Sequence, residues 1–154
     1  SNGSRLVTYA GSIPSNGTNT MDYITIASTG NATDFGDAAE LNNGHAGAGD
    51  SSTRGVFMGG RNQPSPSNIS TINYITIATT GNAIKFGDLS AAKRFGTGTS
   101  DKIRAIFCGG YTSSAQDVIE YVTIATGGDG VDFGNLNTST FSGAAISNAH
   151  GGLG

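Results

Sequence analysis

The chain has 154 residues, the length of one ordinary domain, but Gly, Ser and Thr fill 60 of those positions. Long helices are disfavoured, because Gly costs about 1 kcal/mol at each interior helical position and Ser and Thr prefer caps, turns and strands. The net charge of −3, with no run among the 8 basic residues, argues against nucleic-acid binding, and no apolar stretch is long enough to insert into a membrane.

In chain order, apolar and alternating segments predict short β-strands separated by Gly-rich turns. The most regular segment covers residues 73–79, where Ile75 and Ile77 point to one face and Tyr74, Thr76 and Ala78 point to the other. Neither face is strongly polar, which is typical of a sheet packed on both sides. Further strands are predicted at residues 83–86, 94–99 and 104–108.

One pattern recurs three times. The Tyr-led segment at residues 23–31 returns at residues 74–82 and 121–129, so the Tyr residues are 51 and 47 positions apart. Phe-Gly follows twelve residues after each Tyr, and an Arg-led apolar segment precedes each Tyr, at residues 5–11, 54–60 and 104–110. Four-stranded units repeated every ~40 to 50 residues with Gly and aromatic markers indicate propeller blades.

We therefore predict an all-β fold, a β-propeller segment that spans residues 1–154. Each of its three blades is a four-stranded antiparallel sheet. The blade units lie approximately at residues 5–49, 54–99 and 104–148.

The order of these pieces resembles the kelch-type β-propeller repeat. Ile106-Phe107-Cys108-Gly109-Gly110-Tyr111 is the segment most similar to it. Two departures are visible: the first unit has Ala10-Gly11 in place of the double glycine, and Phe stands where the repeat usually has Trp, at Phe35, Phe86 and Phe133. The Tyr-Ile-Thr-Ile-Ala version is also similar to repeats in virion and tail-associated proteins of tailed bacteriophages, which implies a virion location.

The ends of the pattern predict closure with another copy. The first unit starts at its second strand, near Arg5, and residues 141–148 form a spare inner strand. Rings of this kind start at about four blades, so three blades need a partner. We expect a strand-swapped homodimer of six blades in preference to a trimer of nine. A fragment of a longer propeller is the alternative, and Ser1-Asn2-Gly3 fits either a tag remnant or part of the fold.

Few residues suit catalysis or metal binding, so we expect a protein that is not an enzyme and holds no metal or cofactor. His45 fits a solvated histidine better than a metal ligand, and Cys108 occupies the place of Met58 and Ala10, which suggests an apolar packing residue. The acidic residues 129–132 lack the ligand pattern of an EF-hand.

The recurrence of one arginine in every unit indicates a structural role. The arginines are Arg5, Arg54 and Arg104. We expect them to form ion pairs with acidic side chains such as Asp22, Asp37, Asp88 and Glu120.

The variable segments locate a candidate binding face. The connections at residues 12–20, 61–71 and 112–116 differ in length and content, whereas the tight turns after each Tyr strand are nearly identical. Their neighbours on one face are the connections at residues 38–43, 90–93 and 137–140. Loops on a rigid scaffold commonly carry binding. The candidate ligand-binding residues are Arg61, Asn62, Gln63, Lys93, Arg94 and Tyr111.

Amides beside an aromatic ring and arginines suit sugars or a protein partner. The predicted function is a non-enzymatic binding module, a phage virion or tail component whose variable face contacts a host-surface glycan or protein. A purely structural propeller, used as an assembly platform or spacer, is the alternative. An enzyme with its site on the ring axis is a third hypothesis.

Overall fold

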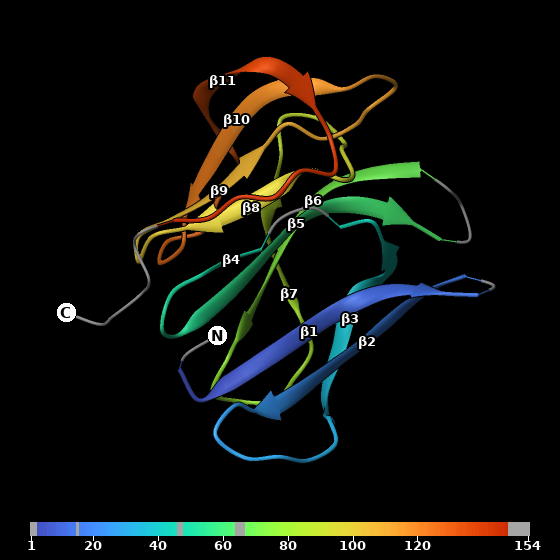
Figure 1. Cartoon of the computed structure of the whole chain (residues 1–154), viewed down its shortest axis with the longest axis vertical. Coiled ribbons are helices and arrows are strands. Elements are labelled where there is room, and N and C mark those ends of the chain that lie inside the picture. The colour runs from blue at the N-terminus through green and yellow to red at the C-terminus, as the bar shows by residue number, and fades with distance from the viewer. Residues whose placement is uncertain (1–2, 15, 46–47, 64–66, 148–154) are drawn as a thin grey trace.

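The computed structural model describes residues 3–14, 16–45, 48–63 and 67–147, and its elements are all β-strands, which confirms the all-β prediction (Figure 1). Within these residues no helix could cross a membrane. The strands are β1 (Arg5–Ile13), β2 (Asn16–Thr25), β3 (Thr33–Asn43), β4 (Ala48–Asp50), β5 (Arg54–Asn62), β6 (Ser67–Thr76), β7 (Ile84–Asp88), β8 (Thr97–Ser100), β9 (Arg104–Cys108), β10 (Gln116–Thr123) and β11 (Val131–Thr140).

The strands form three consecutive antiparallel meanders. Unit one is β1-β2-β3, unit two is β4-β5-β6-β7 and unit three is β8-β9-β10-β11, with each strand paired to its neighbour in sequence. Unit three lies at the top of Figure 1, unit two in the middle and unit one below. Among the described residues β1 pairs only with β2, so unit one has three strands.

Units one and two join into one seven-stranded sheet, so the chain has two antiparallel sheets rather than three separate ones. The cause is the length of β3, whose last residues, Asn42 and Asn43, reach β5 and pair with Asn62 and Arg61. Unit three forms the second sheet, of four strands.

The predicted strand at residues 104–108 is confirmed as β9, but other boundaries shift. The Tyr-led strand of unit two is β6, which ends at Thr76 because the chain turns there, with the Thr79 N–H bonded to the Thr76 carbonyl. The strand predicted from residue 94 starts at Thr97. Phe95 has φ of 55°, a left-handed conformation that interrupts an extended strand.

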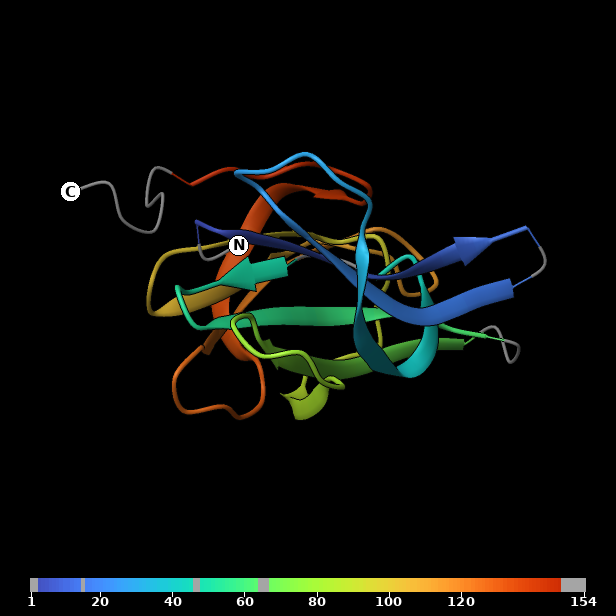
Figure 2. The same cartoon turned by 90° about the horizontal axis from the view of Figure 1, so that it is seen from below.

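Two of the predicted loops are largely hairpin strands. β1 and β2 extend almost to the turn at Pro14, and β5 and β6 leave only residues 63–66 between them. Ser, Thr and Asn side chains hid these strands from an analysis of apolar alternation, since main-chain pairing holds them together. The two hairpins project beyond the rest of the molecule on the same side (Figure 1, Figure 2). Residues 38–43, also predicted as a connection, belong to β3.

The double-glycine position has the same backbone in all three units. Gly59 and Gly109 have φ near 65°, and Ala10 adopts φ of 47° at the equivalent place. A register shift follows at this point in units one and two, so the position is a bulge that bends the strand. The Ala10 departure from the repeat therefore keeps the repeat's geometry.

The apolar core lies between units, as expected for sheets packed on both sides. One cluster joins unit one to unit two through Tyr9, Met21, Phe35, Phe57 and Ile75 among others. The second cluster joins unit two to unit three and includes Met58, Ile72, Leu89, Phe107 and Ile124. Unit two thus buries Ile75 on one face and Ile72 on the other.

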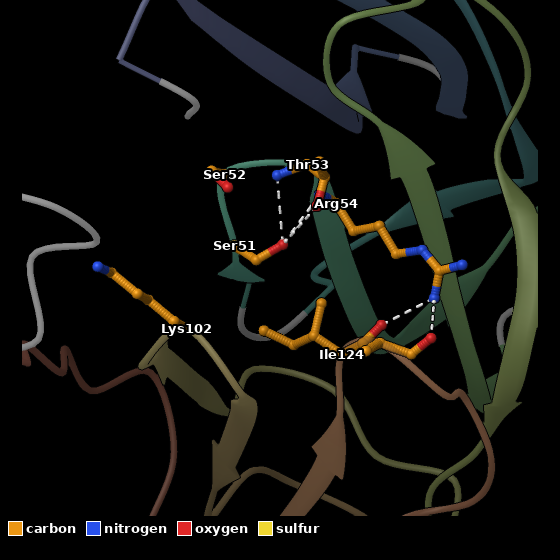
Figure 3. A pocket seen from close by; sticks show the side chains of 7 residues that line it. Ser51, Ser52, Thr53, Arg54, Lys102 and Ile124 are labelled. Carbon is orange, nitrogen blue, oxygen red and sulfur yellow. Dashed lines mark hydrogen bonds between the residues drawn. The ribbon is translucent and has the colours of Figure 1, made fainter.

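We call the junction between two consecutive units a unit seam: the first joins units one and two, and the second joins units two and three. The same set of hydrogen bonds crosses both seams. The Arg5 guanidinium donates to the carbonyls of Ile77 and Ala78 in unit two. The Arg54 guanidinium donates in the same way to the carbonyls of Ile124 and Ala125 in unit three, at 2.9 and 2.8 Å (Figure 3).

The arginine partners differ from the prediction, although the structural role of Arg5 and Arg54 is confirmed. Each arginine lies over the Tyr ring of its own unit, with Arg54 4.8 Å from the Tyr74 centroid. The guanidinium groups donate to main-chain carbonyls of the next unit, which the sequence did not predict.

The Phe-Gly segments of units one and two form the rest of the seams to the units that follow them. The Phe35 carbonyl accepts from the Gly81 N–H, and the Phe86 carbonyl accepts from the Gly128 N–H. A Cβ on Gly87 would lie 2.1 Å from the Gly128 carbonyl oxygen, so only glycine permits this main-chain approach. The tight turns and Phe-Gly segments are therefore complementary parts of one junction.

A buried ion pair crosses the second seam. The Lys93 ammonium contacts a Glu120 carboxylate oxygen, and the other Glu120 oxygen accepts from the Ser90 N–H at 2.7 Å. Both side chains are almost fully buried. Burial by itself raises the pKa of Glu120, but hydrogen bonds from Lys93 and Ser90 outweigh it and hold that pKa below its ordinary value.

Replacing Lys93 is expected to destabilise the fold strongly. Lys93→Met leaves the Glu120 carboxylate buried without its counter-charge, which costs about 3–5 kcal/mol in the free energy of unfolding, measured by urea denaturation. Lys85→Met is the matched control, because Lys85 pairs with Asp88 on the exposed surface and its loss changes little. Equal losses in the two variants would contradict the role of the buried pair.

The same pair makes stability depend on pH. Because folding lowers the pKa of Glu120, the carboxylate stabilises the native state at neutral pH, and this contribution disappears as pH falls below 4.5 through the folded pKa. Glu120→Gln is expected to flatten the stability profile between neutral pH and pH about 3. Asp88 and Asp101 also have lowered pKa values, so the difference between variant and wild type isolates Glu120.

Candidate binding surface

The predicted residues on unit two lie at the end of the β5–β6 hairpin. Arg61 and Asn62 end β5, and Gln63 follows with its N–H bonded to the Leu41 carbonyl at 2.9 Å. The Arg61 N–H donates to the Asn42 side-chain oxygen, and its Nε is buried without a hydrogen-bond partner among the described residues. These three residues are therefore held against β3 by their main chain.

Lys93 does not belong to a surface site. Its side chain is buried in the ion pair with Glu120, so the prediction of Lys93 as a ligand-binding residue is withdrawn. The sequence offered no sign of this, because the partner carboxylate comes from the next unit, 27 residues further along.

Arg94 and Tyr111, both predicted, are brought together. Their main chains exchange two hydrogen bonds, with N···O distances of 3.1 and 2.7 Å. The Arg94 guanidinium lies 5.3 Å from the Tyr111 ring centroid and 5.0 Å from that of Phe95. Contacts of this length are within cation–π range, so the guanidinium is oriented by two rings.

Two phenylalanines missed in the sequence complete this group. Phe141 meets Tyr111 edge-on with centroids 5.3 Å apart, and the Phe95 carbonyl accepts from the Ser142 N–H. Phe95 and Phe141 are both exposed. We call Arg94, Phe95, Tyr111 and Phe141 the aromatic–arginine cluster. A signal for the missed pair exists, because each follows an outer strand and precedes a Gly-containing segment.

Asn68 connects this cluster to the β5–β6 hairpin. Its side-chain amide donates to the carbonyls of Tyr111 and Thr112, at 3.1 and 3.0 Å, and its main chain pairs with Arg61. The predicted residues of unit two and unit three thus share one face, and Asn68 is the residue between them that sequence analysis overlooked.

The groups of this cluster are suited to non-covalent binding. Exposed ring faces and edges offer apolar contact, and the guanidinium offers charged donors in a fixed plane. Tyr and Arg are also among the residue types enriched at the energetically important contacts of protein interfaces. The described residues contain no group of three or more His, Cys, Asp or Glu side chains able to hold a metal ion.

Two pockets lie elsewhere, beside the tight turns. The larger, of about 400 Å³, is formed by Ser51, Ser52, Thr53, Arg54, Lys102, Ile124 and Ala125. In Figure 3 the Arg54 guanidinium reaches the Ile124 carbonyl while Lys102 extends to the opposite side. The cationic groups do not converge, so the pocket is a weaker candidate. The smaller, of about 270 Å³, is formed mainly by the β6–β7 turn.

His45 and Cys108 are both partly buried. His45 meets the Tyr9 ring edge-on at 5.5 Å, and burial lowers its pKa, which favours the neutral imidazole. Burial raises the pKa of the Cys108 thiol, which disfavours the nucleophilic thiolate. Asp129, in the acidic segment compared above with an EF-hand, accepts a hydrogen bond from the Asp88 N–H within the second unit seam.

Comparisons with known proteins add no identity. No protein-family model matches the sequence, and no curated protein matches it either.

Proposed function

We propose that the chain is a segment of a kelch-type β-propeller and serves as a non-enzymatic binding module. The aromatic–arginine cluster, flanked by the β5–β6 hairpin, is the surface that contacts a host-surface glycan or protein. By the resemblance of its repeats, the protein is a component of a phage virion or tail.

The propeller assignment is supported by three meanders in series that pack face to face. The inner strands β4 and β8 lie close to each other, as strands around a common axis do. The same hydrogen bonds join unit one to unit two and unit two to unit three, which supports a regular rotation from one blade to the next.

The binding assignment is carried by the aromatic–arginine cluster. Arg94 is positioned by reciprocal main-chain bonds to Tyr111 and by two rings, so little side-chain freedom is lost on binding. Exposed Phe95 and Phe141 flank it. Hairpins of different length surround this face, and such variation on a rigid scaffold suits recognition.

A structural platform is the second candidate. The observation that favours it is the recurrence of identical seam contacts, which build a rigid spacer whether or not a ligand binds. Binding measurements separate the two functions.

Substitutions in the cluster are expected to weaken recognition. Arg94→Ala and Phe95→Ala should each weaken binding by about tenfold or more, because each removes part of a contact made by oriented groups. The measurement is binding of the labelled chain to a glycan array, to bacterial surface polysaccharides and to whole bacterial cells.

Ile84→Ala is the matched control, since Ile84 is also an exposed apolar residue but lies on β7, outside the cluster. Exchanging residues 61–71 for the shorter segment 112–116 tests the hairpin. Polysaccharide binding that protease treatment of the cells leaves intact identifies a glycan, and protease-sensitive binding identifies a protein. Equal binding by cluster variants and control would contradict the proposal, and absence of binding would favour the platform.

A further inference from the structure

Unit three carries one half of a unit seam that no described residue completes. Arg104 is equivalent to Arg5 and Arg54 and lies over Tyr121 at 4.6 Å, as they lie over Tyr23 and Tyr74. Within the described part of the chain its guanidinium reaches no carbonyl of a following unit. Phe133-Gly134-Asn135 likewise repeats the Phe-Gly-Asp segments that bond the next unit at the other two seams.

Unit one carries the other half. The carbonyls of Ile26 and Ala27 occupy the places of those that accept from Arg5 and Arg54. The turn at residues 30–32 repeats Gly81-Asn82-Ala83, whose Gly81 and Ala83 N–H groups bond to the main chain of unit one and whose Asn82 side chain accepts the Asp37 N–H. The two halves are thus complementary group by group.

Exposure distinguishes these outer faces from the formed seams. Ile26 is 51% exposed, whereas its equivalents Ile77 and Ile124 are 2% and 1% exposed inside a seam. Phe133 is 53% exposed, whereas Phe35 is 2% exposed. Large apolar side chains that are exposed at the positions where their equivalents are buried in a seam indicate that each outer face can be covered by a further unit.

Gly134 gives an independent indication. A Cβ on its equivalents Gly36 and Gly87 would meet the main chain of the next unit at 2.6 and 2.1 Å, but around Gly134 nothing described lies within 4 Å. The clearance that a neighbouring turn needs is present at the outer face of unit three.

We propose that the outer face of unit three docks onto the outer face of unit one in a second copy of this chain, through a seam like the two internal ones. Arg104 then donates to the Ile26 and Ala27 carbonyls, and Gly134 lies against Gly30. Two such contacts, related by a two-fold axis, close a ring of six units. The inference rests on the proposed blade assignment and not on the aromatic–arginine cluster.

The edge of β1 favours the same partner. Strands β5 and β9 are covered on that edge by β4 and β8, whereas β1 has no such neighbour among the described residues. Residues 141–147, predicted as an inner strand, form no strand within the single chain, and Asn148 lies outside the described residues. In the closed pair this segment adds to β1 of the second copy.

The native cysteine reports docking directly. Cys108 is the only cysteine of the chain and lies on the outer face of unit three, at the place where Met58 is buried in a seam. Light scattering is expected to give twice 15.5 kDa, and a thiol reagent should modify Cys108 at least about tenfold more slowly in the concentrated than in the dilute protein.

Ile26→Asp is the decisive variant. It places a charge in the proposed seam but at an exposed position of the single chain, so a folded monomer with reactive Cys108 is expected. Ile84→Asp is the control, because Ile84 stays 55% exposed although unit two has neighbours on both sides. Circular dichroism checks that both variants fold.

A single-chain mass at every concentration, or equal Cys108 reactivity in dilute and concentrated wild type, would overturn the proposal. So would a mass of three copies, or equal behaviour of the two variants. Failure here leaves ligand binding measurable on the monomer, and loss of ligand binding by Arg94→Ala with the dimer intact contradicts only the proposed function.

Discussion

The fold depends on sheets that are apolar on both faces. A sheet of three or four short strands with Ile on one side and Met, Ile and Phe on the other gains its stability only when another layer covers each side. Unit two meets this requirement completely, since Ile75 packs against unit one and Ile72 against unit three. The stacking of units is therefore the source of stability, and a unit alone lacks a core of its own.

Main-chain contacts decide which residues recur. At each seam a turn approaches the Phe-Gly segment so closely that carbonyl and N–H groups bond directly, and a side chain on Gly87 would collide with Gly128. Arginine recurs because its guanidinium spans two carbonyls while stacking on Tyr. Gly36 and Gly87 are thus required by backbone contact between units and not by flexibility.

The sequence predicted what repeats and missed what occurs once. Three copies of the Tyr strand, the Phe-Gly segment and the Arg-led strand are enough to locate the units, because each recurrence repeats the same local geometry. The Lys93–Glu120 pair has no counterpart in the other units, and a lysine read alone resembles a surface residue. Phe95 joins the aromatic–arginine cluster only through a positive φ and contacts from unit three, neither of which spacing reveals. Arg94 and Tyr111 were both predicted for one face because variable connections lie beside them, and the structure brings the two residues into contact.

Conserved geometry and variable surface are separated within each unit. The tight turns of units two and three contact the Phe-Gly segments across the seams, where a Cβ on Gly36 or Gly87 would meet the main chain of the turn. The seams are therefore poor places for new binding contacts. The hairpins on the opposite side have no such constraint. The β1–β2 and β5–β6 hairpins are long, whereas in unit three the first residues of the connection between β9 and β10 fold back, so that Tyr111 pairs with Arg94. A unit can therefore change its hairpin without disturbing its neighbours. That independence explains why the aromatic–arginine cluster draws its residues from the ends of strands and connections. The seam contacts come instead from residues that recur in the repeat, with the Lys93–Glu120 pair as the exception.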